Sequence, residues 1–93
     1  MFKHIVMIKL KNREEAKPVE AMLIGLKQKI SVLRSLEVGL DELYSPRSYD
    51  LVLTTSFDHK EDYFIYDQHA DHQPVKEKIQ AVSESVFTVD YTI

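Results

Sequence analysis

The segment FKHIVMIKL (Phe2–Leu10) gives the strongest indication of the fold. Its even-numbered positions are nearly all apolar, and Ile5 and Met7 add apolar residues at odd-numbered positions. Because side chains alternate between the two faces of a strand, this segment is apolar on both faces and is predicted to be buried on both. A second expected strand, Tyr49–Phe57, has the same character around Leu51-Val52-Leu53. Both are therefore expected at the centre of a sheet.

Two more strands have one apolar face each. Leu36–Leu40 alternates apolar and polar residues, and the turn-forming residues Ser45–Ser48 join it to the strand that follows, which predicts a hairpin. Ser85–Ile93 closes the chain as a fourth strand. Its apolar side chains share one face: Phe87, Val89, Tyr91 and Ile93.

Helices are predicted between these strands. From Val19 onward, apolar residues recur at three- and four-residue steps, and the helix begins either at a capping box of Asn12 with Glu15 or in a first turn containing Pro18. The apolar stripe contains Met22, Leu23, Leu26, Ile30 and Leu33. Asp58 is expected to cap a second helix, with Glu61 three residues on. His69–Gln73 interrupts that helix, and Pro74 begins a third.

The order β-α-β-β-α-α-β predicts an α+β fold of the ferredoxin-like split βαβ type, with a four-stranded antiparallel sheet in a single domain of residues 1–93. Helices would cover only one face of this sheet. The other face would expose an apolar patch, so we expect two copies to pair through their sheets into a dimeric α/β barrel with two-fold symmetry. The alternative is a monomer whose second face is only moderately apolar.

Composition excludes several classes of function. The net charge is −3 and the basic residues are dispersed, which argues against nucleic acid as a partner. The N-terminal segment is interrupted by Lys3, His4 and Lys9, so neither a signal peptide nor a membrane span is expected. The absence of cysteine is compatible with a cytoplasmic location. With two glycines there is no phosphate-binding loop or dinucleotide motif, and no cofactor is predicted.

Several stretches resemble the stress-responsive dimeric A/B-barrel (Dabb) family. They are His4–Leu10, Leu36–Gly39 followed by Ser48–Leu53, Tyr66–Val75, and the closing Val89-Asp90-Tyr91. The resemblance covers nearly the whole chain and implies a ferredoxin-like homodimer. Many members have no assigned activity. One relative, olivetolic acid cyclase, is a polyketide cyclase that closes a linear tetraketide by aldol chemistry without a cofactor.

The resemblance places that cyclase's functional residues on His4, Tyr66 and His72, and all three residue types are retained. Aldol closure needs a base beside a carbonyl and a donor for the developing enolate oxygen. In this hypothesis His72 is the base, Tyr66 is the donor, and His4 orients or assists. Ala70 departs from the family's usual proline in the loop before His72. The structural alternative is that His4 is a satisfied core residue and that His72 caps the helix beginning at Pro74.

A metal site is a further alternative, because His69 and His72 flank Asp71 and His4 could lie near them. The spacing is not specific, and no metal is predicted. Two functions therefore remain. One is a homodimeric Dabb protein of unassigned activity with a pocket for a small carbonyl-containing ligand. The other is a cofactor-independent polyketide cyclase or lyase that uses His/Tyr acid–base chemistry.

Overall fold

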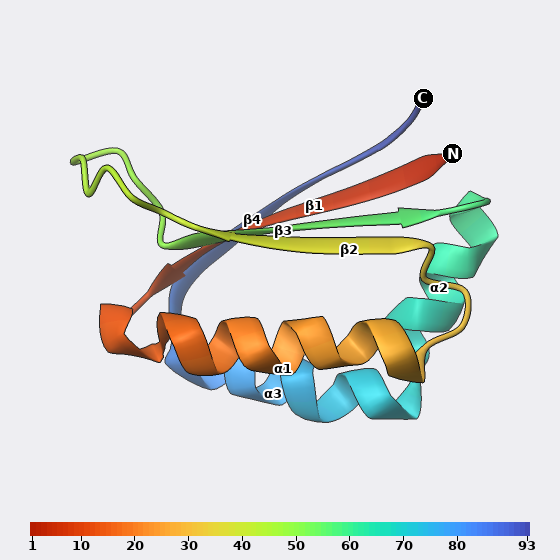
Figure 1. Ribbon diagram of the computed structural model, residues 1–93, viewed down its shortest axis with the longest axis horizontal. Coiled ribbons are helices and arrows are strands. Elements are labelled where there is room, and N and C mark those ends of the chain that lie inside the picture. Colours follow the sequence, from red (N-terminus) through yellow and green to blue (C-terminus); the bar gives the residue numbers. More distant parts are fainter.

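The computed structural model describes all 93 residues, which form one sheet with a layer of helices on one side (Figure 1). The strands are β1 (Phe2–Leu10), β2 (Ser35–Leu40), β3 (Leu51–Phe57) and β4 (Ser83–Thr92). The helices are α1 (Ala16–Lys29), α2 (Lys60–Gln68) and α3 (Gln73–Val82), with short 3₁₀ turns η1 (Arg13–Glu15) and η2 (Ala70–His72). The predicted order of elements is confirmed.

The sheet has the strand order β2-β3-β1-β4, and every neighbouring pair is antiparallel. β1 and β3 are the central strands, as the apolar character of Phe2–Leu10 and Leu51–Phe57 predicts. The register aligns His4 of β1 with Thr55 of β3 on one side and with Asp90 of β4 on the other. These three side chains therefore point to the same face of the sheet.

The hydrophobic core lies between the sheet and the helices. β1 contributes its even-numbered side chains, and α1 contributes the stripe predicted from its spacing, except that Ile30 and Leu33 follow the helix rather than belong to it. The fully buried apolar side chains include Ile8, Val19, Leu23, Leu26, Ile30, Leu33, Phe57 and Tyr66. This layer fixes the helices against one face only.

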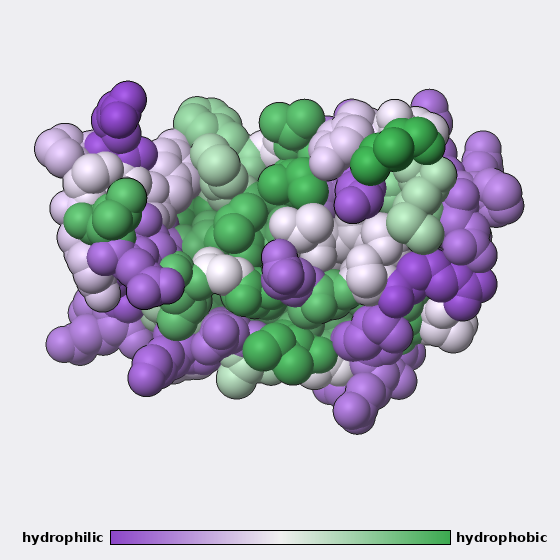
Figure 2. Space-filling view, turned by 45° about the horizontal axis from the view of Figure 1, so that its top comes forward, coloured by the Kyte–Doolittle hydropathy of each residue, from purple (hydrophilic) through white to green (hydrophobic).

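The other face of the sheet is uncovered in the protomer, and we call it the open face. The odd-numbered side chains of β1 and β4 lie on it. Phe87, Val89 and Ile93 are 62%, 63% and 75% exposed, and Met7 and Tyr91 are also exposed. Figure 2 shows hydrophobic residues gathered across the middle of the molecule, with hydrophilic residues around them. β1 is thus buried in the protomer only on the face that packs against the helices. The expected burial of its open face requires a second copy of the chain.

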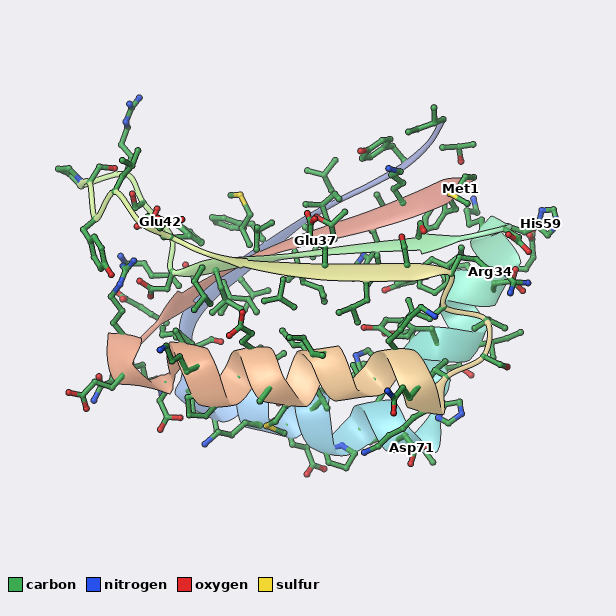
Figure 3. All side chains as sticks on the ribbon, viewed as in Figure 1. Met1, Arg34, Glu37, Glu42, His59 and Asp71 are labelled. Carbon is green, nitrogen blue, oxygen red and sulfur yellow. The ribbon has the colours of Figure 1, made fainter.

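Helix α2 begins one residue later than predicted. Asp58 pairs with Arg34 instead of capping the helix, with 2.8 Å between the guanidinium Nη2 and carboxylate Oδ2 atoms. His59 occupies the N-cap position, and its backbone N–H donates to Asp62. Arg34 and His59 lie at the same end of the molecule in Figure 3. Asp58, the predicted N-cap, therefore pairs with Arg34, and His59 occupies the N-cap position in its place.

The β2–β3 hairpin is fixed at the end that carries its connecting loop by the buried carboxylate of Asp50. Asp50 accepts hydrogen bonds from the Leu10 backbone N–H and from Arg13, at 2.6 Å each. Arg13 also pairs with Asp41 at 2.9 Å. β3 begins at Leu51, two residues later than the predicted Tyr49. Asn12 likewise caps the η1 turn, and α1 follows from Ala16.

Candidate functional site

His4 faces the helices from the middle of the sheet and is buried. Its Nδ1 atom forms a hydrogen bond with Oδ1 of Asp90, its cross-strand partner on β4. The ring of Tyr63, on α2, lies over the imidazole with 4.7 Å between ring centroids. A carboxylate on Nδ1 orients the imidazole and leaves Nε2 for other contacts. His4 is thus a buried histidine whose hydrogen-bond partner is a carboxylate, as the structural alternative for this residue expects.

Tyr66 is the most deeply buried polar side chain of the candidate site, with 1% of its surface exposed. Its ring packs against that of His72, with 4.2 Å between centroids, and against Phe57. Its hydroxyl has no hydrogen-bond partner within the protein. Burial raises the pKa of this phenol far above its usual value, with smaller contributions from Tyr63 and Asp67. The hydroxyl therefore remains a neutral donor.

His72 ends the η2 turn and is held by the helix before it. Its Nδ1 atom lies 3.1 Å from the backbone carbonyl oxygen of Tyr66. A carbonyl only accepts, so Nδ1 carries the proton and Nε2 keeps its lone pair in the neutral ring. Burial lowers the pKa of His72, and the positive charge of Lys76 lowers it further. His72 occupies the N-cap position of α3, but its side chain does not cap that helix.

A cavity of about 340 Å³ lies between the sheet and helices α2 and α3, and all three predicted site residues line it: His4, Tyr66 and His72. Aliphatic side chains form much of the remaining wall: Val6, Ile8, Leu23, Leu53, Ile79 and Val86. The site thus places a neutral phenol and a histidine paired with a carboxylate beside an apolar wall. Small-molecule sites commonly combine a mostly apolar surface with a few convergent polar groups.

Two larger hollows have a different character. One, of about 420 Å³, surrounds Arg13, Asp41 and Asp50, whose charges pair with one another. The other, of about 520 Å³, lies beside Lys60 and Phe64 on α2 and reaches Asp90 from outside. Neither combines a buried, unpaired donor with histidine side chains. The cavity of about 340 Å³ is therefore the better candidate for a site that binds a ligand through polar side chains.

The alternative metal reading is not supported by the geometry. His69 accepts a hydrogen bond on Nδ1 from the backbone N–H of Asp71, at 3.1 Å. His72 has its Nδ1 directed at Tyr66. No three histidine or carboxylate side chains lie close enough together to hold a metal ion. Figure 3 shows Asp71 at the outer corner of the helical layer.

The sequence interpretation missed Asp90, and a signal for it was present. β4 carries Phe87, Val89 and Tyr91 on the open face, so Asp90 must point the other way, toward the helices. An acidic residue at a position directed toward the core needs a partner. The antiparallel pairing of the first and last strands supplies His4. Without the register, parity alone could not name that partner.

A four-stranded antiparallel sheet in the order β2-β3-β1-β4, with helices on one face, defines a ferredoxin-like α+β protein. The chain belongs to the Stress Responsive A/B Barrel Domain (Dabb) family, whose model matches residues 2–93. None of its helices is long and apolar enough to cross a membrane. Among curated protein sequences, none matches the chain.

Solved structures share this fold over nearly the full chain. A dimeric protein of unknown function from Bacteroides fragilis is 32% identical, with a TM-score of 0.84 over 99% of this chain and 95% of that one. A Dabb family protein from Mesorhizobium loti is 23% identical, with a TM-score of 0.75 over 99% and 95% of the two chains. A hydroxynitrile lyase from Passiflora edulis is 15% identical, with a TM-score of 0.84 over 99% and 92%, a likeness of fold alone.

Proposed function

We propose that this protein is a homodimer that binds a small carbonyl-containing molecule in the cavity lined by His4, Tyr66 and His72. The observation that carries the proposal is Tyr66, which lines the cavity and whose buried hydroxyl has no partner within the protein. An unpartnered buried donor costs about 1–3 kcal/mol. A ligand oxygen that accepts from this hydroxyl would remove that cost.

A carbonyl group fits the polar end of the cavity. Tyr66 is a neutral donor because burial raises its pKa, and a carbonyl oxygen is an acceptor that carries no charge into the site. His72 presents the unprotonated Nε2, which accepts a proton or a hydrogen bond. The aliphatic wall would hold the rest of the ligand. A volume of about 340 Å³ suits a small molecule.

The open face supports the dimer. A contiguous surface of exposed Phe87, Val89 and Tyr91 is unusual for a monomer, and a second copy would cover it. The charges of this face have opposite signs, because Lys3 lies on it and Glu37 projects from it, away from the helices (Figure 3). These charges allow pairs between subunits. The Bacteroides fragilis relative is described as dimeric, and the cysteine-free sequence suits a cytoplasmic location.

Tyr66→Phe tests the ligand proposal with a stability readout and a binding readout. We expect its free energy of unfolding to be unchanged or raised by about 1 kcal/mol, because the variant removes an unpaired buried hydroxyl and keeps the ring. Binding is measured by ligand-observed NMR with matched pairs, such as cyclohexanone and methylcyclohexane. The unaltered protein should prefer the ketone, and Tyr66→Phe should lose that preference.

The matched control is Tyr44→Phe, which removes the same hydroxyl from an exposed tyrosine outside the cavity. This control should leave the preference for ketones intact. If the unaltered protein binds ketones no better than hydrocarbons, or if Tyr66→Phe retains the preference, the proposed carbonyl site is wrong.

The second candidate function is a cofactor-independent cyclase or lyase, and the His4–Asp90 hydrogen bond is the observation that favours it. In this reaction Nε2 of His72 removes a proton from the carbon next to a carbonyl. The electron pair moves onto the carbonyl oxygen, where Tyr66 donates to the developing enolate. The enolate carbon then either regains the proton from His72 or attacks a second carbonyl carbon, whose oxygen takes the electron pair of the broken π bond and then the proton held by His72. His4, oriented by Asp90, assists from the sheet.

A further inference from the structure

An ion pair bridges the two helices beside His72. Nζ of Lys76, in the first turns of α3, lies 2.7 Å from Oδ1 of Asp67, near the end of α2. Both residues line the same cavity as His72 and Tyr66. Each side chain is about one-third exposed, at 39% for Lys76 and 34% for Asp67. The pair therefore lies where the cavity meets solvent.

We propose that Lys76, held at the cavity by Asp67, helps to keep His72 unprotonated, which makes Lys76 and Asp67 positioning residues of the acid–base site. The inference deepens the proposed function and rests on it for its catalytic meaning. Neither residue was singled out by the sequence interpretation, because the pair depends on the angle between α2 and α3. The spacing of nine residues has no periodic significance of its own.

The groups that face His72 can be named element by element. From α2 they are Tyr66, whose carbonyl accepts from Nδ1, and Asp67. From α3 the charged group is Lys76. Helix α1 presents Leu23 to the cavity, and β1 presents His4. Lys76 is the cation of this set, and Asp67 is the carboxylate that faces His72.

The two charges act on His72 in opposite directions. Lys76 lowers its pKa, whereas Asp67 and the backbone acceptors of α2 raise it, and burial gives the largest effect, a lowering. The ion pair holds the ammonium group at the cavity instead of leaving it free in solvent. A base must be unprotonated before it accepts a proton. A cation held beside His72 favours its unprotonated form at neutral pH.

The test is the titration of His72, followed by NMR of its ring ¹⁵N and ¹³C nuclei in the full-length protein. Lys76→Met should raise the pKa of His72, because it removes the facing cation. Asp67→Asn should change the pKa of His72 by less than Lys76→Met does, because it removes the facing carboxylate and also releases the ammonium group, and these two changes have opposite effects. The matched control is Lys78→Met, which removes the same charge from the same helix at a residue that pairs with Glu15 instead, at 3.4 Å. This control should leave the titration of His72 unchanged.

Two results would overturn the inference. One is a His72 titration that is the same in Lys76→Met as in Lys78→Met. The other is an Asp67→Asn variant that shifts the titration further than Lys76→Met does, which would indicate that the position of the ammonium group does not govern His72. Lys76→Gln is measured alongside, so that a folding defect of the methionine variant cannot hide the result. An ion pair with only a structural role would change the melting temperature and not the titration.

The readout needs no ligand, so it separates this inference from the proposed function. If the titration shifts as expected and no ketone binds, the ion pair controls His72 but the carbonyl site is wrong. If ketones bind through Tyr66 and the titration does not shift, the carbonyl site stands and the role of Lys76 and Asp67 is rejected.

Discussion

Val89→Glu is expected to convert the protein from a dimer into a folded monomer. Val89 lies on the open face, halfway along the edge strand β4 and in register with Ile5 of the central strand β1. In a face-to-face dimer the substitution would bury two unpaired carboxylates, one from each subunit. Burial of an unpaired charge costs several kcal/mol, so the dissociation constant should rise at least about a thousandfold. Light scattering coupled to size-exclusion chromatography measures the change, against a protomer mass of 10.9 kDa.

The matched control is Ile24→Glu, which introduces the same charge at an exposed apolar position of helix α1. That variant should remain dimeric. Circular dichroism establishes that Val89→Glu is folded, which is expected because Val89 is 63% exposed in the protomer. A mass of 10.9 kDa for the unaltered protein at micromolar concentration would contradict the dimer. A Val89→Glu variant with twice that mass would contradict the open face as its interface.

His72→Ala is expected to abolish the acid–base activity of the second candidate function. The activity is measured as deuterium incorporation next to the carbonyl of a ketone that binds, in D₂O at neutral pH. Removal of a positioned base typically costs about 10²–10⁴-fold in rate. Because the alanine leaves space beside Tyr66 and the aliphatic wall, added imidazole should restore part of the rate.

The control for this variant is His59→Ala, which removes a histidine from the N-cap of α2, outside the cavity. It should retain the full exchange rate. Full activity in His72→Ala would reject the assignment of His72 as the base. A variant that still binds the ketone but no longer exchanges the proton would separate catalysis from ligand binding.

Much of the fold follows from periodicity. Apolar residues at both parities of Phe2–Leu10 and around Leu51-Val52-Leu53 correctly predict the two central strands, although one face of each is uncovered in the protomer. The three- and four-residue steps of α1 correctly predict its buried stripe. The closing strand correctly places Phe87 with Val89 on one face. These patterns repeat along the chain and need no knowledge of distant contacts.

Features that depend on distant contacts could not be predicted in the same way. Arg34 takes the carboxylate of Asp58 from the N-cap of α2, across 24 residues of sequence. Asp90 reaches His4 across 86 residues, and only the strand register brings the two together. The prediction of His4, Tyr66 and His72 as site residues came from family resemblance. All three residues line one cavity, which supports that prediction.

The most direct test of the account follows the carbonyl carbon itself. Cyclohexanone labelled with ¹³C at the carbonyl is titrated with the protein, and its chemical shift is extrapolated to the fully bound state. A hydrogen bond from Tyr66 polarises the carbonyl, so we predict a downfield shift with the unaltered protein and a much smaller one with Tyr66→Phe. A bound shift equal to that in an apolar solvent, or equal in the two proteins, would contradict the claim that the buried hydroxyl receives a carbonyl ligand.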